Sequence, residues 1–257
     1  MLPQIVQDIV GESHDALMQG RTPEGVLPYL IEQRGVNEQS LKLFEIGFCD
    51  ASFERKINRA FYDLESQKMA FPYGRHIRDR VIVPIKNDCG KLVSFATRPA
   101  SASHDWWNFP FTKGSFLFGL NKSRSACFHK NKLYLVEGYF DVIVLFQKGL
   151  QNIACPMGTR FSLVQAGLVL RYCNEVCLCF DTDPLTERGG PGAGQRAMLR
   201  ILSDDAVKPL LKITTIKLPM GIDPDEFVLS KRRGITDLLA LEGKPRDIEG
   251  LIHGETR

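Results

Sequence analysis

The second half of the chain alternates between short apolar runs and longer amphipathic segments, and this alternation restricts its fold more than any other feature. The apolar runs predict β-strands at 132–136, 152–155, 176–180 and 211–217, and the other segments predict helices at 139–147, 163–172, 195–202 and 225–230. Parallel strands need a crossover connection, which is usually a helix. The alternation therefore predicts an α/β fold with a central, mainly parallel sheet flanked by helices.

The first half of the chain has a different pattern. Residues 1–70 are predicted to be mostly helical, because apolar side chains recur at helical spacing, as in 26–31. Two β-rich runs follow at 80–85 and 92–97, and the Asn-Asp-Cys-Gly turn between them predicts a hairpin. Pro84 indicates that the first strand ends there or lies at a sheet edge. We therefore expect a smaller α+β subdomain before the parallel sheet.

These two patterns predict three regions along the chain. We expect an N-terminal α+β subdomain over 1–130, an α/β domain over 131–232, and a C-terminal tail or truncated helical segment over 233–257. A chain of 257 residues can bury a core without disulfides or metal.

The composition excludes disordered, fibrous and membrane-spanning classes, since 44% of residues are hydrophobic and 25% are charged. The longest aliphatic or aromatic run, 142–146, is far shorter than the roughly 20 residues that span a bilayer. Residues 1–11 lack the features of a secretory signal. An odd number of cysteines, seven, favours reduced thiols over a disulfide framework. We therefore expect a cytoplasmic protein with no membrane partner.

Three of the predicted strands are each followed by two carboxylates. These are Glu137 and Asp141, then Asp181 and Asp183, then Asp223 and Asp225. In open parallel sheets, ligands bind at the carboxyl ends of the strands, so we expect the six acids near one edge. Any single pair also has a structural explanation, because Asp can cap a helix or complement its dipole. Six acids at one edge repel one another unless a cation or a basic partner offsets them.

Carboxylate oxygens are the ligands that Mg²⁺ and Mn²⁺ prefer, and substrate phosphates usually complete such sites. The acids therefore predict a metal site for phosphoryl or nucleotidyl transfer.

Residues 71–130 are basic, with ten Lys or Arg against three Asp or Glu. Aromatic residues are interleaved with these charges, namely Phe71, Tyr73, Phe95, Trp106, Trp107, Phe109, Phe111, Phe116 and Phe118. Two interpretations stay open. The segment forms a groove that neutralises phosphates and stacks bases of a single strand, or the aromatic side chains belong to the core and the charges to a solvated face.

Four short segments occur in the order and approximate spacing of the TOPRIM domain. They are Glu-Gly-Tyr-Phe-Asp at 137–141, Met-Gly-Thr at 157–159, Phe-Asp-Thr-Asp at 180–183 and Asp-Pro-Asp at 223–225. Upstream, the segments 20–49, 78–85 and 111–120 resemble the N-terminal motifs of bacterial primases. Over most of residues 15–230 the chain thus resembles the catalytic core of the bacterial DnaG-like DNA primases.

The resemblance implies a DNA primase, a DNA-directed RNA polymerase that makes short RNA primers on single-stranded DNA by metal-dependent nucleotidyl transfer. It implies metal binding by Asp181, Asp183, Asp223 and Asp225, and catalytic roles for Glu137, as general acid or base, and Asp141. It implies phosphate contacts from Arg78, Arg80, Arg98 and Lys113, and a closely approached turn at Gly158 and Thr159. The implied cofactor is Mg²⁺ or Mn²⁺, as two ions, and no zinc is expected.

The implied partners are a single-stranded DNA template, ribonucleoside triphosphates and a replicative helicase. The chain departs from the family at several points. The loop after Asp183 is longer than usual, and residues 105–108 read Asp-Trp-Trp-Asn where the family commonly has Pro-Lys-Tyr-Leu-Asn, so that an expected lysine is missing. The zinc-ribbon pattern is absent, because no Cys-x-x-Cys pair occurs. Two explanations stay open: partners supply the missing functions in trans, among them a separate zinc-binding module, or the chain is a reduced primase of the kind that phages and plasmids encode.

Two other functions stay open. A TOPRIM nuclease would use a similar metal site for hydrolysis, and cleavage without nucleotides would distinguish it from a primase. A non-catalytic nucleic-acid-binding subunit would retain the fold for assembly, so that Asp181 and Asp183 would be dispensable. A topoisomerase is disfavoured, because it needs a nucleophilic tyrosine on a further domain.

Overall fold

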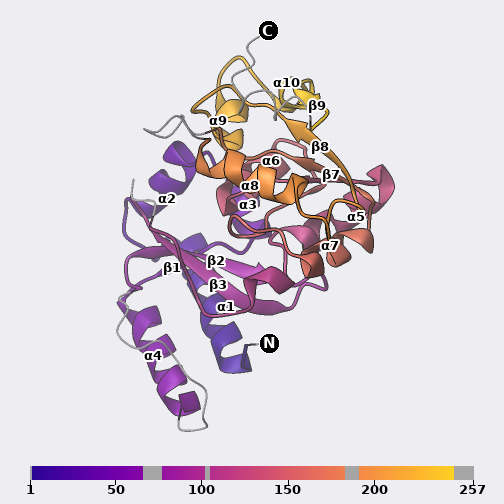
Figure 1. Cartoon of the computed structure of the whole chain (residues 1–257). Helices are drawn as coiled ribbons and strands as arrows, with labels where there is room; N and C mark the ends of the chain where they lie inside the picture. Colours follow the sequence, from indigo (N-terminus) through magenta and orange to yellow (C-terminus); the bar gives the residue numbers. More distant parts are fainter. Residues whose placement is uncertain (1, 66–76, 102–104, 183–190, 246–257) are drawn as a thin grey trace. The chain divides into compact units, whose positions relative to one another are not determined.

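The computed structural model describes residues 2–65, 77–101, 105–182 and 191–245 (Figure 1). By their contacts the residues divide into two compact units. Unit 1 comprises Met1–Lys86 and Gly90–Phe111, and unit 2 comprises Asn87–Cys89 and Thr112–Arg257. Each unit has its own hydrophobic core.

Unit 1 contains a small antiparallel sheet with the order β1-β2-β3-β4. Its strands are β1 (Gly47–Cys49), β2 (Arg80–Lys86), β3 (Leu92–Pro99) and β4 (Trp107–Asn108). Its helices are α1 (Gln4–Met18), α2 (Val26–Pro28), α3 (Glu38–Leu43) and α4 (Ala51–Glu65), with a π-helical turn at Tyr29–Gln33. Val6 and Val10 of α1 share one apolar cluster with Phe53 and Ile57 of α4 and Phe95 of β3. The two long helices therefore pack on the sheet.

The predicted hairpin is confirmed, because β2 and β3 pair antiparallel along their length. Pro84 does not end β2, but β1 pairs only with its first three residues, Arg80 to Ile82. Pro84 therefore pairs with β3 on one side and, among the described residues, has no strand partner on the side of β1, where it lies at the sheet edge. The sequence analysis predicted no strand before residue 80, yet Gly47–Cys49 forms β1.

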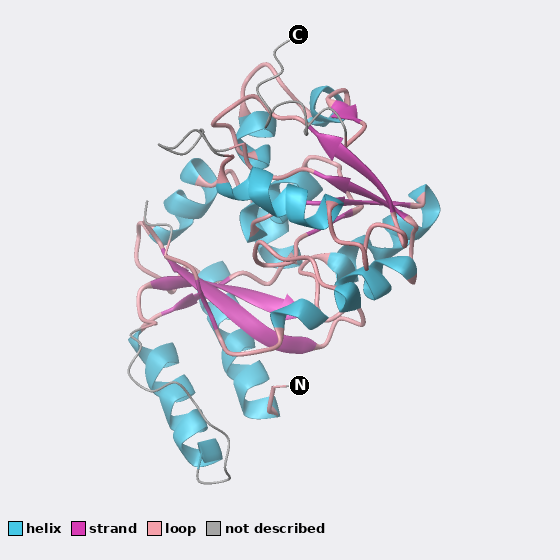
Figure 2. Cartoon of the chain, in the orientation of Figure 1, coloured by secondary structure: helices cyan, strands magenta, loops and turns pink. Residues whose placement is uncertain are grey.

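Unit 2 contains a sheet with the order β6-β5-β7-β8-β9. Figure 2 draws the strands in magenta and the helices in cyan. Its strands are β5 (Lys132–Leu135), β6 (Ile153–Ala154), β7 (Glu175–Leu178), β8 (Lys212–Ile216) and β9 (Glu242–Gly243). Its helices are α5 (Leu120–Lys130), α6 (Tyr139–Gln147), α7 (Leu163–Leu170), α8 (Ala193–Leu202), α9 (Pro224–Leu229) and α10 (Ile235–Leu239), with a 3-10 turn at Lys113–Ser115. The first four strands are parallel and β9 is antiparallel to β8. The expected α/β fold with a mainly parallel sheet is confirmed.

The helices of unit 2 follow from their apolar patterns. In α8, Met198 and Ile201 are buried while Arg196 and Arg200 are exposed, as expected for a helix with one face on a core. The α8 core residues share a cluster with Val169 of α7 and with buried residues of β5 and β7. Helices α7 and α8 are therefore held against the sheet by the same core.

The observed division between the units lies upstream of the predicted limit at residue 130. Helix α5 belongs to unit 2, because Ser123 Oγ donates a hydrogen bond to Ile153 O at 2.6 Å and Cys127 is part of the unit 2 core. Beyond residue 232, α10 and β9 continue the fold, and β9 extends the sheet. The domain limits drawn from the sequence stay a prediction.

Three aromatic side chains of the basic segment belong to hydrophobic cores. Phe95, Phe109 and Phe118 are buried, and the rings of Phe95 and Phe109 stack with their centroids 5.2 Å apart. For these three the core interpretation is the right one. Phe71 and Tyr73 lie outside the described residues. Among the helices that are described, none is long and apolar enough to cross a membrane.

Candidate active site

The carboxylates that follow β5 and β7 are brought together by the sheet. Leu135 of β5 pairs in parallel with Leu178 of β7, so the residues after these strands leave the sheet at the same edge. The Asp181 backbone N–H donates a hydrogen bond to Glu137 Oε1 at 3.1 Å, and both residues are half-buried. The structure therefore joins two of the predicted site residues.

Asp141 lies in the first turn of α6 and is buried. Its Oδ2 accepts a hydrogen bond from the Gly138 N–H at 2.9 Å, and its Oδ1 accepts one from the Asp225 N–H at 3.4 Å. Burial raises the pKa of the Asp141 carboxyl well above its ordinary value, and the nearby Asp225 and Asp223 carboxylates raise it further. Asp141 thus helps to cap α6 and links this helix to α9.

Asp223 and Asp225 lie at the start of α9, whose first residue is Pro224, a residue suited to that position. Asp223 occupies the N-cap position with extended backbone, but its side chain makes no capping hydrogen bond. Asp225 is buried, and its Oδ1 accepts a hydrogen bond from the Glu226 N–H at 2.8 Å. Helix capping, which the sequence left open, therefore does not account for the Asp223 side chain.

Gly194, in the first turn of α8, lets this helix approach the acids closely. A Cβ atom at Gly194 would lie 2.2 Å from Glu137 Oε1 and 2.3 Å from the backbone oxygen of Asp181. A backbone oxygen cannot swing aside as the end of a long side chain can. Glycine is therefore required here. The sequence analysis did not assign Gly194 to the site, although the two glycines at 192 and 194 were a sign of close packing.

Thr182 connects Asp181 to the loop that carries Asp223. Its buried Oγ1 donates a hydrogen bond to Pro219 O at 2.6 Å, and its backbone oxygen accepts one from the Gly221 N–H at 2.6 Å. Sequence reasoning missed Thr182, because a threonine between two acids has no distinctive pattern. Asp183, the next predicted ligand, lies outside the described residues.

The donor chemistry of this sheet edge suits a hard divalent cation, since its acidic side chains are carboxylates. These are Glu137, Asp141, Asp181, Asp223 and Asp225. Within the described parts of the chain, no three His, Cys, Asp or Glu side chains gather closely enough to hold an ion. The predicted ligands therefore fit Mg²⁺ or Mn²⁺ in kind, and ligation by Asp181, Asp183, Asp223 and Asp225 stays a prediction.

Arg80, predicted to contact phosphate, is buried in the sheet of unit 1. Its Nε donates to Thr97 Oγ1 at 2.9 Å, its Nη2 donates to Thr97 O at 3.1 Å, and its Nη1 pairs with Asp105 Oδ2 at 3.0 Å. These bonds use the guanidinium to join β2, β3 and the segment before β4. Phosphate contact by Arg80 stays a prediction.

Arg98, the second such arginine on this sheet, is also buried. Its guanidinium carbon lies 5.4 Å from the ring centroid of Trp106 and 6.0 Å from that of Tyr29, within the range of cation–π contacts. Burial raises the pKa of the Tyr29 hydroxyl, and Arg98 partly offsets this rise. Arg98 thus has a structural role in unit 1, and its predicted phosphate contact is untested.

Arg78 and Lys113 are exposed, as a phosphate-binding role requires. Arg78 Nε lies 3.8 Å from Asp79 Oδ2, and partial burial lowers the pKa of the Lys113 amine. Gly158 and Thr159 are exposed in the loop after β6. A Cβ at Gly158 would meet no atom within 4 Å, so packing does not require glycine there.

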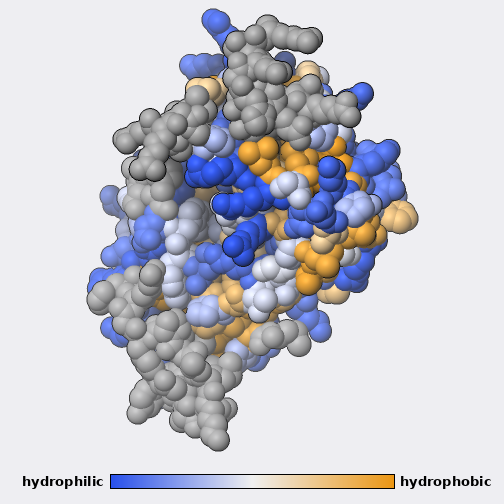
Figure 3. Space-filling model, viewed as in Figure 1, coloured by the Kyte–Doolittle hydropathy of each residue, from blue (hydrophilic) through white to orange (hydrophobic). Residues whose placement is uncertain are grey.

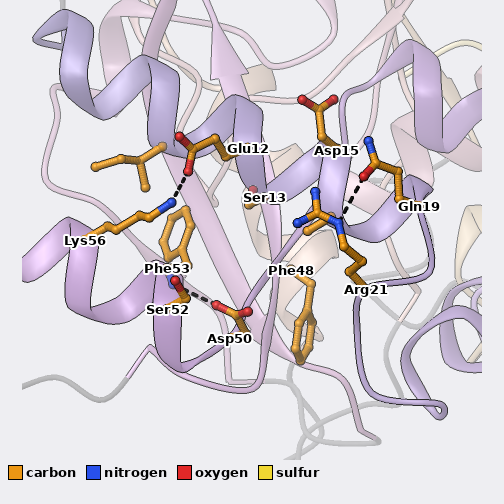
Figure 4. A pocket seen from close by; sticks show the side chains of 12 residues that line it. Glu12, Ser13, Asp15, Gln19, Arg21, Phe48, Asp50, Ser52, Phe53 and Lys56 are labelled. Atoms are coloured by element: carbon orange, nitrogen blue, oxygen red, sulfur yellow. Dashed lines mark hydrogen bonds and ion pairs between the residues drawn. The ribbon is translucent and has the colours of Figure 1, made fainter.

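Unit 1 contains a pocket of about 300 Å³ between α1, β1 and α4 (Figure 4). Its charged side chains are largely matched with polar partners from the same pocket. Lys56 pairs with Glu12, and Arg21 Nε donates to Gln19 Oε1 at 3.0 Å. This mixture of charges shows no preference for an anion or a cation.

The mainly parallel sheet of unit 2, with acids at the carboxyl ends of its strands, is the arrangement of a Toprim-type domain. The family model of the Toprim domain matches residues 131–217, and the model of the N-terminal domain of the DNA primase catalytic core matches residues 14–133. Over these residues the chain belongs to the family of bacterial DnaG-like DNA primase cores.

The similar proteins agree with this family. The chain is 31% identical over 244 residues to a DNA primase of Synechococcus elongatus. The aligned region covers 84% of this chain and 33% of that protein. The E. coli primase catalytic core has a TM-score of 0.72 at 26% identity, covering 92% of this chain and 78% of that one. A DnaG primase catalytic domain bound to single-stranded DNA has a TM-score of 0.62 at 23% identity, covering 93% and 81%. The chain thus spans about a third of the length of the curated relatives that it matches.

Proposed function

We propose that this chain is the primer-synthesising core of a DNA primase, which joins ribonucleoside triphosphates on a single-stranded DNA template. One observation supports this most directly. In a chain whose two halves match the two parts of the DnaG core, Glu137 and Asp181 are hydrogen-bonded at the carboxyl edge of the sheet. Homologous DNA primases are nucleotidyltransferase-type enzymes, and Toprim primases use divalent metal ions.

In this proposal, Asp181, Asp183, Asp223 and Asp225 hold two Mg²⁺ or Mn²⁺ ions. When bound, such ions neutralise substrate phosphates and activate a 3′-hydroxyl for in-line attack. Glu137, oriented by the Asp181 amide, is the general acid or base. Asp141 maintains the relative positions of α6 and α9, and therefore of Asp225, through the two hydrogen bonds that it accepts.

Template binding is proposed for the exposed cations Arg78 and Lys113, supported by a similar DnaG catalytic domain that was solved with single-stranded DNA. Arg80 and Arg98 are proposed to contribute chiefly by maintaining the β2–β3 sheet, since their guanidinium groups contact neighbours within unit 1. A replicative helicase and a zinc-binding module acting in trans remain proposed partners.

The test is synthesis of labelled oligoribonucleotides on single-stranded DNA with all four ribonucleotides and Mg²⁺ or Mn²⁺. Asp181→Asn is expected to reduce product on the order of 100-fold, because it removes a proposed metal ligand. Asp205→Asn is the matched control: Asp205 is an exposed acid of unit 2 beyond the end of α8, and its replacement should leave synthesis unchanged.

Two results would overturn the proposal. Template cleavage without nucleotides, abolished by Asp181→Asn, would identify a nuclease. Single-stranded DNA binding without synthesis or cleavage, even when helicase and zinc module are supplied, would identify a non-catalytic nucleic-acid-binding subunit.

A further inference from the structure

A second pocket, of about 420 Å³, lies in unit 2 where the loop after β6 meets the C-terminal half of α8. It is lined by Thr159, Arg160, Phe161, Ser162, Arg200, Ile201 and Asp204. Its volume falls within the range of small-molecule sites. Phe161 and Ile201 are buried members of the unit 2 core, so the floor of the pocket is apolar and fixed, whereas Arg160 and Arg200 are exposed.

The two arginines give this pocket a preference for anions. Neither Arg160 nor Arg200 forms an ion pair with a carboxylate of the described residues. By contrast, the exposed Arg171 of the same unit pairs with Asp88 at 2.8 Å. Two guanidinium groups from different elements thus line one pocket without an ion pair to a described carboxylate, and such groups bind phosphate through paired, charge-assisted hydrogen bonds.

The start of α7 adjoins the pocket through Ser162, which lines it. Ser162 caps this eight-residue helix, and its Oγ accepts a hydrogen bond from the Gln165 N–H at 3.0 Å. The backbone N–H groups of Leu163 and Val164 precede the first bonded turn, so they have no partner within the helix. Helix N-termini favour negative charge, and Thr159 adds an exposed hydroxyl.

Asp204 restricts which anion the pocket accepts. It is half-buried, and its Oδ1 accepts a hydrogen bond from the Ala206 N–H at 2.9 Å. A carboxylate beside two arginines disfavours a bare polyphosphate and favours a ligand that carries a hydrogen-bond donor near its phosphate, as the hydroxyls of a ribose do.

The surface over α7 carries apolar side chains beside hydrophilic ones (Figure 3). Leu163 and Val164, which directly follow the lining residue Ser162, are 55% and 58% exposed. Exposed apolar side chains that follow a lining residue are what a nucleobase attached to a phosphorylated ribose can use.

We propose that this pocket binds a nucleoside phosphate, with its phosphate on Arg160 and Arg200 and a sugar hydroxyl on Asp204. The inference rests on the proposed function only for the class of ligand. Binding is measured without template and with a chelator in place of divalent metal. A negative result would therefore contradict the pocket and leave the proposed primer synthesis untouched.

The first experiment maps arginine modification by phenylglyoxal, using mass spectrometry of the full chain with and without ATP. ATP at about ten times its dissociation constant is expected to slow modification of Arg160 and Arg200 about tenfold, because only the unliganded fraction of the chain reacts, and to leave the exposed Arg232 unchanged. Equal rates with and without ATP at both arginines would overturn the proposal. Protection by oligothymidylate but not by ATP would also overturn it, in favour of a nucleic-acid strand.

The second experiment measures ATP and inorganic tripolyphosphate binding by calorimetry in the same buffer. Arg200→Gln should weaken ATP binding about tenfold, whereas Lys208→Gln, which removes an exposed cation outside the pocket, should not change it. Asp204→Asn should tighten tripolyphosphate binding more than ATP binding, because the repelling carboxylate is gone. Equal losses in Arg200→Gln and Lys208→Gln would contradict a specific site.

Discussion

The acids of unit 2 were predicted from their positions after β-strands, and the arginines of unit 1 from the resemblance to primases, and the structure places the two sets differently. Glu137 and Asp181 lie at the carboxyl edge of the sheet and are joined by a hydrogen bond. Arg80 and Arg98 instead lie buried among partners of their own unit. Arg80 and Arg98 thus have structural contacts within unit 1, whereas the catalytic roles of the acids and the phosphate contacts of the arginines stay predictions.

The difference shows what a strand position does and does not determine. The end of a parallel strand places the next residues at a known sheet edge, whatever their side chains are. A residue within a strand is placed on one of two faces, and its burial depends on what covers that face. Arg98 contacts the rings of Tyr29 and Trp106, which both lie outside β3. The alternation of residues along a strand therefore does not predict these contacts.

The largest effect on activity is expected from Gly194→Ala, which places a methyl group against the acids at the carboxyl edge of the unit 2 sheet. The new methyl group would meet Glu137 Oε1 and the Asp181 backbone oxygen, so α8 or the acids must shift. We expect primer synthesis to fall on the order of 100-fold and the free energy of unfolding to fall by about 1–3 kcal/mol. Product formation and chemical denaturation measure the two effects.

The matched control for this change is Gly167→Ala in α7. A Cβ at Gly167 meets no atom within 4 Å, and alanine favours a helix by about 0.5–1 kcal/mol. This variant should therefore be slightly more stable and fully active. Full activity in Gly194→Ala would show that the close approach of α8 to the acids is unimportant for the chemistry.

An intermediate effect is expected from Arg80→Ala in unit 1. The change removes the bonds to Thr97 and Asp105, and we expect it to lower the free energy of unfolding by about 2–3 kcal/mol. Both tryptophans of the chain, Trp106 and Trp107, belong to unit 1, so tryptophan fluorescence during urea unfolding reports on this unit.

Arg78→Ala is the control for Arg80→Ala, because Arg78 is exposed and should change stability by less than about 0.5 kcal/mol. If Arg80→Ala left stability intact and weakened only DNA binding, the expected structural role of Arg80 would be wrong, and Arg80 would bind phosphate instead.

The smallest effect concerns a half-buried carboxylate away from the acids at the carboxyl edge of the sheet, Glu242 of β9. Burial raises the pKa of its carboxyl, but hydrogen bonds from Lys132, Thr214 and Tyr134 outweigh this effect, and the pKa lies below its ordinary value. A carboxyl whose pKa is lower in the folded state stabilises that state at pH values above its ordinary pKa of about 4.3. This contribution is lost as the pH falls below that value.

Glu242→Gln is therefore expected to lower the free energy of unfolding by about 1–2 kcal/mol near pH 6, and by less near pH 4. Circular dichroism during denaturation at the two pH values measures this difference. If the two proteins differed in free energy of unfolding by the same amount at both pH values, the Glu242 charge would not contribute to stability.

Much of unit 2 was predictable, because each of its strands and helices is short and has a clear local pattern. The predicted helix at 139–147 is α6, and the predicted strand at 132–136 contains β5. The short strand β6 was predicted because it lies within the apolar run 152–155. β1, β4 and β9 were missed, because two or three residues without such a run show no periodicity. They form only because a longer neighbouring strand offers them hydrogen bonds.

The candidate site divides in the same way. Glu137 and Asp181 were identified from their positions after strands, whereas Gly194 and Thr182 were not assigned to the site. Gly194 matters because of what a methyl group would meet, and Thr182 matters because of a hydrogen bond to Pro219. Neither property is visible in a residue and its neighbours along the chain.

By itself, the sequence determined the order of strands and helices, the mainly parallel sheet and the edge at which the acids lie. These follow from local periodicity and from the short connections of βα units. Only the tertiary structure decided which charged side chains are buried and how closely α8 approaches the acids. Such facts depend on contacts between segments far apart in the chain, as between Asp141 and Asp225, and these contacts form only when the whole core packs.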